Sequence, residues 1–395
     1  MVTDHESGNL KHRQVLLLSN VPSPYFSPVF SLLAESAEWR LKTCYISSWN
    51  EDVGWSPQSA GSFSNPADTI LARQPLQIGG WGNRQIIATC SLLLCVLKER
   101  SDFFLIYGYT QLPQLFLIGW ALLRNIPFAI AGDANYYSDK AAGWKRLVKK
   151  HWLGWLTRRA SAIVTVGTAC RMFWEVYGAL PDQLFHVGFA VDNDFFGQAA
   201  IQQKGKAAEL KREWGWEDRT VFIYVGRLIA RKNVHVLISA LRRLSNLPVA
   251  LLIVGNGEER ERLERLAEQS PYIRFVGTAT QAELPLFYAL SDALVLPARE
   301  EPWGLVINEA MASGLAIISH QHCGATLDLV NEENGFVLQG FTAEAIVSAL
   351  SFIAQDRARL KALKQKSLER IRDWSMPRAA CQLKQAIDMA ICNHN

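Results

Sequence analysis

Two cations follow a buried apolar segment in the second half of the chain. The strand expected over 221–225 ends at Gly226, and Arg227 and Lys232 lie in the loop before a helix that begins near Asn233. This order places both cations at the carboxyl edge of a sheet, beside a helix N-terminus whose free N–H groups favour anions. Arginine offers a planar fork of donors and lysine a point charge, which together suit a diphosphate. Taken alone, the pair is equally well interpreted as solvated loop charges.

Two glutamates occupy a comparable position further along the chain. A strand expected over 292–296 leads into a short loop with Glu301, and the helix that opens at Gly304 carries Glu309. An anion lying over the amides of Gly304 and Leu305 would meet carboxylates at two distances. Carboxylates accept hydrogen bonds from vicinal hydroxyls, as on a ribose or a pyranose. Ordinary helix charges are the alternative interpretation of this pair.

The length and charge of the chain limit the classes of protein to which it can belong. A length of 395 residues predicts about two to three domains. Lysine and arginine number 41 against 37 acidic residues, a net charge of +4, so no global polycation suggests a nucleic-acid partner. Hydrophobic residues make up 49% of the chain and charged residues 20%, which excludes an intrinsically disordered protein.

Cysteine usage and the N-terminus bear on the compartment. The seven cysteines are scattered and include no Cys-x-x-Cys pair, so they predict neither a disulfide framework nor a zinc site and favour a reducing compartment. Residues 1–12 are polar, lack the apolar core of a signal peptide and are expected to be disordered. A membrane-spanning helix needs about 18 or more apolar residues, and no uninterrupted run reaches that length. We therefore expect a cytoplasmic protein.

Short apolar segments alternate with amphipathic ones along both halves of the chain. In the first half, the pattern predicts strands at 14–20, 41–46, 103–107, 127–131 and 162–166, and helices at 29–35, 84–98, 112–124 and 141–159. In the second half, it predicts strands at 220–225, 248–254, 272–276, 292–296 and 315–318, helices at 233–244, 257–268, 281–289 and 304–313, and a helical tail at 342–391 interrupted near 374–377. Strands that alternate with helices form parallel sheets covered on both faces.

This pattern divides the chain into two doubly wound α/β domains of Rossmann type. We expect them at 13–195 and 196–373, with the junction in the polar, charged region between 188 and 220. The segment 374–395 is expected to form a helix that returns to the first domain. In such sheets, ligands bind at the carboxyl ends of the strands, so two facing sheets form one cleft between the domains.

The ordered motifs of the second half resemble the retaining glycosyltransferases of the GT-B fold that carry a Glu-x7-Glu signature, of the bacterial cell-envelope and exopolysaccharide type. The matching segments are GRLIARK at 226–232, VGNG at 254–257, FVG at 275–277, EPWGLVINEAMASG at 301–314 and NGFV at 334–337. The first half matches more loosely, through NVPSPYFSP at 20–28, GY at 108–109, GDAN at 132–135, VGTACRMFWEVYG at 166–178 and FAVDNDFF at 189–196.

The resemblance implies roles for particular residues. The donor diphosphate and the transferred sugar would meet the catalytic residues Arg227, Lys232, Glu301 and Asp133. Glu309 would hold the ribose hydroxyls, and the backbone near 276–278 would meet the nucleobase. The residues expected to bind the rest of the donor are Gly226, Val276, Gly277, Thr278, Trp303, Gly304, Leu305 and Glu309. The acceptor side would be lined by Pro24, Tyr25 and Tyr109. Many relatives have His-Asp where this chain has Gly132-Asp133, so the catalytic base stays open.

The resemblance also implies a mechanism and substrates. The sugar would leave a UDP- or GDP-linked donor and join a glycan or lipid-linked acceptor with retention of configuration, by a front-face internal return that needs neither a metal nor a cofactor. Two other classes remain as alternatives: a nucleotide-sugar epimerase or phosphorylase on the same fold, and a non-catalytic nucleotide-sugar-binding partner. An epimerase converts the donor without an acceptor, a phosphorylase needs free phosphate, and a non-catalytic partner is expected to have a decayed site.

Two groups of residues could be mistaken for metal sites. Asp192-Asn193-Asp194 spells the Asp-x-Asp of metal-dependent transferases of another fold, but its place before the domain junction favours a turn or a helix cap. His320 and His322 follow an expected strand without a carboxylate or cysteine at metal spacing, so satisfied or solvated histidines are expected.

The segment 140–159 is basic and rich in tryptophan, and it contains no acid. On a helix, an apolar stripe is expected from Trp144, Leu147, Val148, Trp152, Trp155 and Leu156. Such a helix suits an anionic bilayer surface, through the candidate residues Trp144, Lys145, Arg146, Lys149, Lys150, Trp152 and Trp155. The protein would then lie on the inner face of the plasma membrane. A core-packed helix with a solvated basic face is an equally good interpretation.

Overall fold

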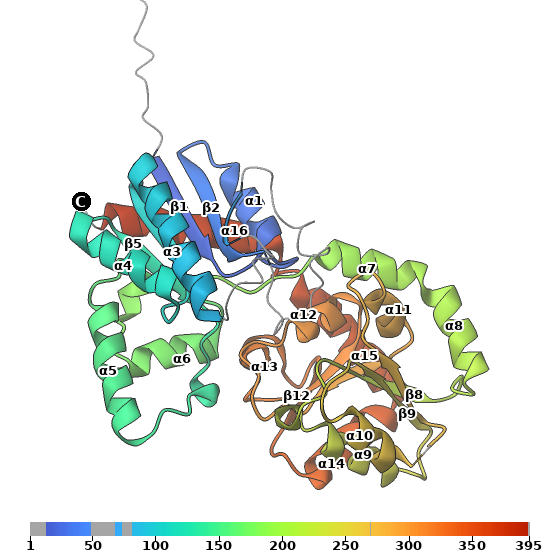
Figure 1. Ribbon diagram of the computed structural model, residues 1–395. Helices are drawn as coiled ribbons and strands as arrows, with labels where there is room; N and C mark the ends of the chain where they lie inside the picture. The colour runs from blue at the N-terminus through green and yellow to red at the C-terminus, as the bar shows by residue number, and fades with distance from the viewer. Residues whose placement is uncertain (1–12, 49–67, 73–80, 269, 394–395) are drawn as a thin grey trace, which may run out of the picture.

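The chain forms two α/β domains, each built on a parallel sheet (Figure 1). The computed structural model describes residues 13–48, 68–72, 81–268 and 270–393. The expected leader at 1–12 and most of the loop expected after 47 lie outside these residues. Among the described helices, none is long and apolar enough to cross a membrane.

The first sheet has seven strands in the order β3-β2-β1-β4-β5-β6-β7. These strands are β1 (Arg13–Ser19), β2 (Trp39–Ser47), β3 (Thr69–Ala72), β4 (Phe103–Tyr107), β5 (Phe128–Gly132), β6 (Ala162–Thr165) and β7 (Leu184–His186). Their side chains alternate between two cores: Leu16 and Leu18 face one, Val15 and Leu17 the other. Both faces of a parallel sheet must be covered, so the strands are almost continuously apolar.

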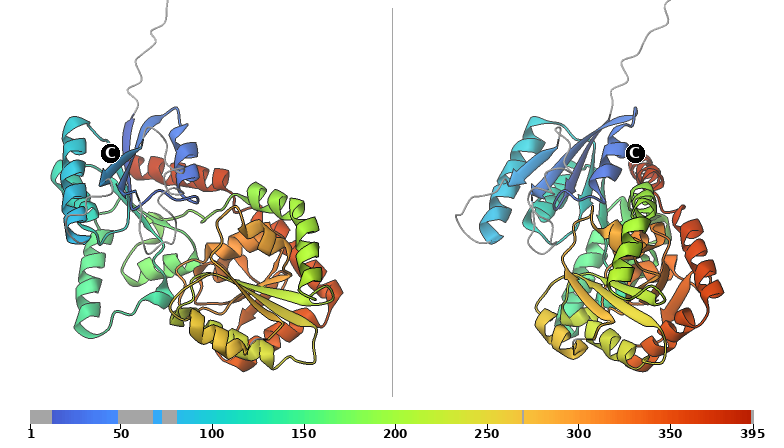
Figure 2. Two further views of the ribbon diagram at one scale, coloured as in Figure 1. Left: turned by 45° about the vertical axis from the view of Figure 1, so that its right-hand side comes forward. Right: turned by 90° about the vertical axis from the view of Figure 1, so that its right-hand side faces the viewer.

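Each face of the first sheet has its own helix layer. The core that holds Leu16 and Leu18 is closed by α3 (Trp81–Lys98), α4 (Leu112–Arg124), α5 (Gly143–Thr157) and α6 (Thr168–Val176). The other core is closed by α1 (Ser27–Ala34) and α16 (Met376–Cys392). Figure 2 shows α16, in red, lying beside the blue helix α1, although it is the last helix of the chain. The polypeptide therefore crosses between the domains twice.

The second sheet has six strands in the order β10-β9-β8-β11-β12-β13. These strands are β8 (Thr220–Val225), β9 (Val249–Val254), β10 (Ile273–Gly277), β11 (Ala293–Leu296), β12 (Ala316–His320) and β13 (Gly335–Leu338). The helices around them are α9 (Val234–Arg242), α10 (Arg260–Ala267), α11 (Leu284–Ala289), α12 (Leu305–Ala312), α13 (Gly324–Leu329), α14 (Ala343–Ala354) and α15 (Arg357–Ile371). Because β8 lies between β9 and β11, the loops after these strands share one edge of the sheet.

The polar, charged region between 188 and 220, for which the sequence predicts no helix or strand, forms two helices in the structure. These are α7 (Asn193–Gln202) and α8 (Lys204–Glu213), which pack against α11 and α12 of the second domain. Asp192 caps α7, since its Oδ1 accepts a hydrogen bond from the Phe195 amide at 2.9 Å, as expected of a helix cap. The helical tail also has a second break, at 355–356, where Asp356 caps α15 through the Arg359 amide.

The expected apolar stripe of α5 is also wrong in part. Leu153 and Leu156 are the buried side chains that pack α5 on the sheet, whereas Trp144, Leu147 and Val148 are 70%, 61% and 59% exposed. Helix α5 therefore packs on the first domain through its C-terminal half, and its N-terminal half is exposed. Trp152 and Trp155 are half-buried and stack on each other, with ring centroids 5.3 Å apart.

Candidate functional site

Lys232 and Glu301 form a buried ion pair at the carboxyl edge of the second sheet. Lys232 ends the short 3-10 turn η4 (Ala230–Lys232) after β8, and its Nζ donates to a carboxylate oxygen of Glu301 in the loop after β11. The pair is possible because β8 and β11 are neighbours in the sheet. Burial, helped by the charge of Arg231, lowers the pKa of Lys232 to about 8. The Glu301 carboxylate acts in the opposite sense and favours the charged amine.

Two further cations lie near Lys232. Arg227 and Arg231 both contribute charge that disfavours the protonated form of Lys232, so both lie within its electrostatic reach. The Arg231 guanidinium donates to the Glu300 carbonyl at 2.7 Å, which fixes it, while the Arg227 side chain is exposed. A site with more cations than anions at a strand edge has the composition of an anion-binding site.

The loop that carries Glu301 is fixed from both domains. Asn135 of the first domain donates through its Nδ2 to the carbonyls of Glu301 and Pro302, each at 3.1 Å. The Gly324 amide donates to the Glu301 carbonyl at 3.1 Å, from the start of α13. Gly304 has a φ of 95°, and a Cβ there would lie 2.6 Å from the Cys323 sulfur, so this position needs glycine. In the first turn of α12 the Ile307 amide donates to the Gly304 carbonyl at 2.9 Å, so the amides of Leu305 and Val306 are the ones that remain for a ligand.

Glu309 lies on α12 and is only 1% exposed. Its Oε1 accepts a hydrogen bond from the Tyr25 hydroxyl and its Oε2 from the Tyr288 hydroxyl, both at 2.7 Å. Burial raises the pKa of Glu309 to about 7, although the two tyrosine hydrogen bonds favour its ionised form. The structure thus brings Tyr25, expected on the acceptor side, onto the carboxylate expected to hold the ribose. In this arrangement both carboxylate oxygens of Glu309 have partners from the chain itself.

The glycine turns after β8, β9 and β10 pack closely at the same edge. Gly226 has a φ of 147°, and a Cβ on Gly255 would collide with the Gly226 carbonyl oxygen. Gly277, with a φ of 78°, accepts a hydrogen bond from the Gly255 amide at 2.7 Å. Val276 is half-buried and Thr278 is exposed. The predicted residues Gly226 and 276–278 therefore lie on neighbouring turns of one sheet edge.

The first domain contributes Asp133, Tyr109 and Pro24. Asp133 directly follows β5 and is exposed, yet the surrounding protein withdraws enough water from its carboxylate to raise its pKa. Tyr109 follows β4, is half-buried, and has a raised pKa, chiefly through burial and then through the charge of Asp139, with a smaller contribution from Asp133. Pro24 is buried after β1. A carboxylate that is open to solvent while surrounded by protein is typical of a crevice.

Contacts between the domains bring the two carboxyl edges together. The Thr168 amide and hydroxyl donate to the Asp328 carboxylate at 2.9 and 2.6 Å, and the Asn308 side chain donates to the Phe189 carbonyl at 2.9 Å. Trp303 is buried at this interface, where a Cβ on Gly167 would collide with its ring. The Trp303 side chain therefore serves the interface, and only its backbone remains for the expected donor contact.

Sequence reasoning missed three residues of this region. Tyr288, Asn135 and Asp328 were assigned no role, although Tyr288 holds Glu309 and the other two join the domains. Asn135 stands in the quoted GDAN segment, directly after a strand, which was the available signal. Tyr288 lies in an ordinary apolar helix pattern that gives no such signal.

The two histidines after β12 are engaged within the chain. His320 stacks on Phe341 with ring centroids 3.8 Å apart, and burial lowers its pKa to about 4. Its Nδ1 accepts a hydrogen bond from the His322 amide at 3.1 Å. Within the part of the chain that the structure describes, no three His, Cys, Asp or Glu side chains are grouped as a metal site would need.

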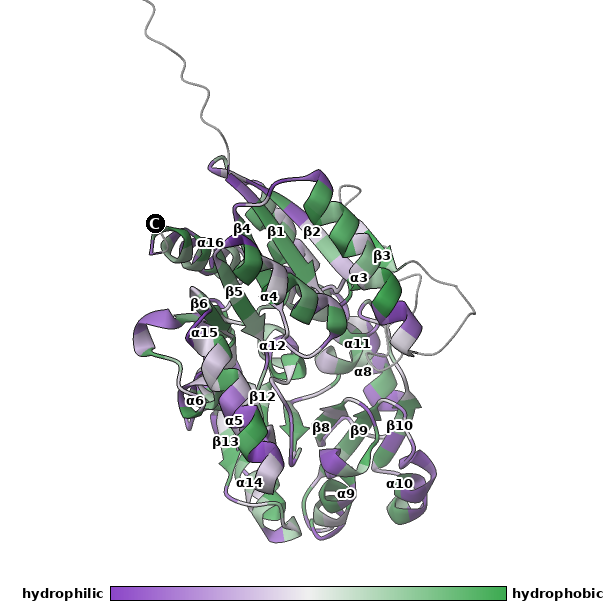
Figure 3. Ribbon diagram, turned by 60° about the vertical axis from the view of Figure 1, so that its left-hand side comes forward, coloured by the Kyte–Doolittle hydropathy of each residue, from purple (hydrophilic) through white to green (hydrophobic). Residues whose placement is uncertain are grey.

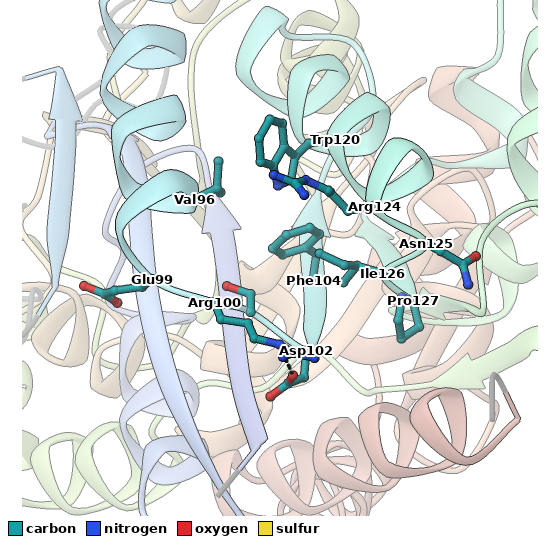
Figure 4. A pocket seen from close by; sticks show the side chains of 11 residues that line it. Val96, Glu99, Arg100, Asp102, Phe104, Trp120, Arg124, Asn125, Ile126 and Pro127 are labelled. Atoms are coloured by element: carbon teal, nitrogen blue, oxygen red, sulfur yellow. Dashed lines mark ion pairs between the residues drawn. The ribbon is translucent and has the colours of Figure 1, made fainter. Parts of the chain in front are cut away.

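A separate cavity of about 470 Å³ lies at the opposite edge of the first sheet (Figure 4). Asp102, just before β4, faces it, together with residues that follow α3 and residues at the end of α4, among them Arg100 and Trp120. Arg100 pairs with Asp102 at 3.6 Å. Ligands of doubly wound sheets bind at the carboxyl ends of strands. This cavity lies at the amino ends and is therefore not the candidate site.

Comparison with known proteins places this geometry in context. Residues 206–370 match the family model "Glycosyl transferases group 1". The solved structure of Anabaena HepE in complex with UDP and glucose superposes with a TM-score of 0.72 and 16% identity, over 95% of this chain and all of that one. WaaG, a glycosyltransferase involved in lipopolysaccharide biosynthesis, superposes with a TM-score of 0.66 and 16% identity, over 94% and 99%.

The chain has the GT-B fold. The fold class expected from the sequence is thus confirmed, and the family match together with the GT-B neighbours supports a glycosyltransferase.

Curated relatives of this GT-B chain include glycosyltransferases. A GDP-mannose-dependent α-(1-6)-phosphatidylinositol monomannoside mannosyltransferase of Mycobacterium tuberculosis is 30% identical over 40% of this chain, and the match spans 44% of that relative's length. The D-inositol 3-phosphate glycosyltransferase of Corynebacterium glutamicum is 27% identical over 78% of this chain and 77% of its own length.

Proposed function

We propose that the protein is a retaining glycosyltransferase. It would transfer a sugar from a UDP- or GDP-linked donor to a glycan or lipid-linked acceptor in bacterial envelope or exopolysaccharide synthesis. The observation that carries this proposal is the Lys232–Glu301 pair, which lies with Arg227 and Arg231 at one sheet edge and faces the first domain through Asn135. A relative that uses GDP-mannose and a structural neighbour that holds UDP support the choice of donors.

In the proposed reaction, the cations serve the leaving group. The bond between the sugar and the donor phosphate oxygen breaks, and negative charge grows on the diphosphate, where Arg227 and Lys232 stabilise it. Lys232 then exchanges one anionic partner for another. Its release frees Glu301 to accept hydrogen bonds from the sugar hydroxyls. Because Lys232 is already buried and positioned, little reorganisation is needed at the moment of transfer.

Retention follows if the acceptor attacks from the face that the diphosphate leaves. The acceptor hydroxyl oxygen forms the new bond to the sugar, and its proton passes to the departing phosphate oxygen. Asp133, at the end of β5 in the first domain, would orient the sugar or the acceptor. This scheme needs no metal, and in it the chain supplies position and charge.

Helix α5 is proposed to meet an anionic membrane surface, which would place the protein on the inner face of the plasma membrane. Trp144, Lys145, Arg146 and Lys150 are exposed on its N-terminal half. Lys149 departs from the prediction, because it pairs with Asp139 at 2.7 Å. The headgroup contact would therefore use the other three cations, with Trp144 at headgroup depth.

A ligand panel followed by product analysis tests the proposed function. Nucleoside diphosphates and their sugars are compared by thermal shift, because a ligand that binds the folded state raises the unfolding temperature. We expect UDP or GDP to give a shift that Lys232→Ala abolishes and that the exposed control Lys366→Ala retains. Proton NMR of the product then reports its anomeric configuration. Inversion would overturn the retaining mechanism, and donor conversion without acceptor would indicate an epimerase.

A further inference from the structure

The helix layer α3–α5 exposes an unusual share of large apolar side chains. Of the sixteen large hydrophobic residues that are exposed in the described part of the chain, ten lie on these three helices. They are Ile86, Ile87, Leu94, Leu97, Leu112, Leu115, Leu123, Trp144, Leu147 and Val148. Single exposed apolar residues are normal in soluble proteins, but a concentration over one layer marks an interaction surface.

The exposed residues of α3 form a stripe along one side of the helix. Ile87, Cys90, Leu94 and Leu97 follow one another at steps of three and four, and all are exposed. Helix α4 packs directly against α3, and Leu123, near its end, is 76% exposed. Figure 3 shows α3, α4 and α5 from the outside, with hydrophobic segments along all three helices.

The charge of this layer has one sign. The three helices contain seven cations and no aspartate or glutamate: Arg84, Lys98, Arg124, Lys145, Arg146, Lys149 and Lys150. By contrast, α10 in the second domain alternates arginine with glutamate, as exposed helices commonly do. Helices that expose apolar side chains and carry cations without acids are complementary to a lipid bilayer, which has an apolar interior and, with anionic lipids, a negatively charged surface.

We propose that the outer face of α3, α4 and α5 docks on an anionic lipid bilayer. The leucines and isoleucines of α3 and α4 enter the acyl region, and the cations of the layer other than Lys149, which pairs with Asp139, bind headgroup phosphates. This inference extends the proposed contact of α5 to the whole layer and does not depend on transferase activity. A second copy of the chain fits this face poorly, because pairing would bring the same cations together. The bilayer satisfies both the apolar area and the charge.

The exposed cysteines of the chain supply a depth probe with an internal control. Cys90 lies on the α3 stripe, and Cys381 lies on α16, which covers the opposite face of the first sheet; both are exposed. Two variants are made, each keeping one of these thiols and carrying serine at the other and at Cys95 and Cys392. Each is labelled with a polarity-sensitive nitrobenzoxadiazole fluorophore and mixed with vesicles of phosphatidylglycerol and phosphatidylcholine.

We expect the label on Cys90 to brighten, shift to the blue and become protected from iodide, while the label on Cys381 does not change. Equal responses at both positions, or no response at Cys90 in protein that floats with the vesicles, would overturn the proposal. Equal binding to vesicles of phosphatidylcholine alone would overturn its electrostatic part.

A pair of surface variants tests the same face without labels. Leu94→Glu with Leu123→Glu places acids on α3 and α4, and Ile201→Glu with Met389→Glu places them at exposed apolar positions on α7 and α16. We expect vesicle flotation to fall about tenfold or more in the first variant and to persist in the second, since each leucine removed from the acyl region costs about tenfold. Unchanged flotation of the first variant, or self-association that only the first variant loses, would contradict a lipid partner. Thermal unfolding confirms that both variants fold.

Discussion

The two domains hold several of their candidate site residues in opposite ways, although Arg227 in the second domain is exposed and Pro24 in the first is buried. In the second domain, Lys232 and Glu309 are buried and each has partners from the chain, whereas in the first domain Asp133 is exposed and Tyr109 is half-buried. Buried paired groups keep their geometry before a ligand arrives, and exposed ones adjust to it. In the proposed reaction, the second domain would therefore hold the donor in a fixed geometry, and the first domain would adjust to the acceptor.

The largest effect is expected from Lys232→Ala, which removes the buried cation of the second domain. Stabilisation of charge on a leaving group by one preorganised donor is worth about 100- to 1000-fold in turnover, and we expect a loss of that size. The variant also leaves Glu301 without its partner, so the unfolding temperature should fall. Adding Glu301→Gln should restore stability and not activity. Wild-type initial rates in Lys232→Ala would refute the assignment of the second domain.

Glu309→Gln tests the buried carboxylate through its pH dependence. The raised pKa near 7, against a usual value of 4.5, means that the folded protein keeps a proton that the unfolded chain releases. The contribution of Glu309 to stability is therefore fully present below pH 4.5 and is lost as the pH rises to 7. Over this window we expect the unfolding free energy of the wild type to fall by up to about 3 kcal/mol relative to the variant. Urea unfolding at a series of pH values measures it, and parallel curves would show that Glu309 does not titrate there.

Asp133→Asn addresses the first domain and sharpens the contrast. Because Asp133 is exposed and has an orienting role in the proposed reaction, we expect turnover to fall about tenfold, while donor binding and the unfolding temperature stay near those of the wild type. Initial rates at saturating donor, together with a thermal shift, separate the two quantities. A loss as large as that of Lys232→Ala would remove the difference between the domains.

The smallest effect on turnover is expected from the two tyrosines on Glu309, which come one from each domain. Tyr288→Phe leaves a fully buried carboxylate oxygen without a donor and should cost about 1–3 kcal/mol. Tyr25→Phe removes a contact between the domains, so we expect a smaller stability loss and a change in donor affinity, measured by titration calorimetry. Both variants should raise the pKa of Glu309 further, since both hydrogen bonds favour its ionised form. Equal effects would show that the two tyrosines have the same role.

The sequence predicts the elements that are buried on both sides. Strands 103–107 and 220–225 and helix 112–124 are found at their predicted bounds, since continuous apolar runs and a proline at the helix start leave few alternatives. Helix α8 escapes prediction because it buries only Ala207 and so has almost no apolar face. Strands β3 and β7, of four and three residues, are too short to show a period.

The sequence predicts which candidate site residues meet only where their meeting follows from the order of the strands in the sheet. Lys232 and Glu301 can be expected to meet because their strands are neighbours in a doubly wound sheet. Tyr25 and Glu309, 284 residues apart, meet only because the two domains are docked in one particular way, which no local pattern records. The stripe of α5 fails for a similar reason, since periodicity identifies an apolar face and cannot tell which part of that face the rest of the domain covers.

The return of α16 to the first domain has a mechanical consequence. The chain passes between the domains near Val191 and again near Ser375, and these two passages pair as parallel backbone. Trp374, beside the second passage, fills the space left by Gly188 at the first. Two connections that lie side by side form a hinge. Any separation of the two domains is therefore a rotation about the line along which the connections run. Twisting or sliding, by contrast, would have to break the pairing.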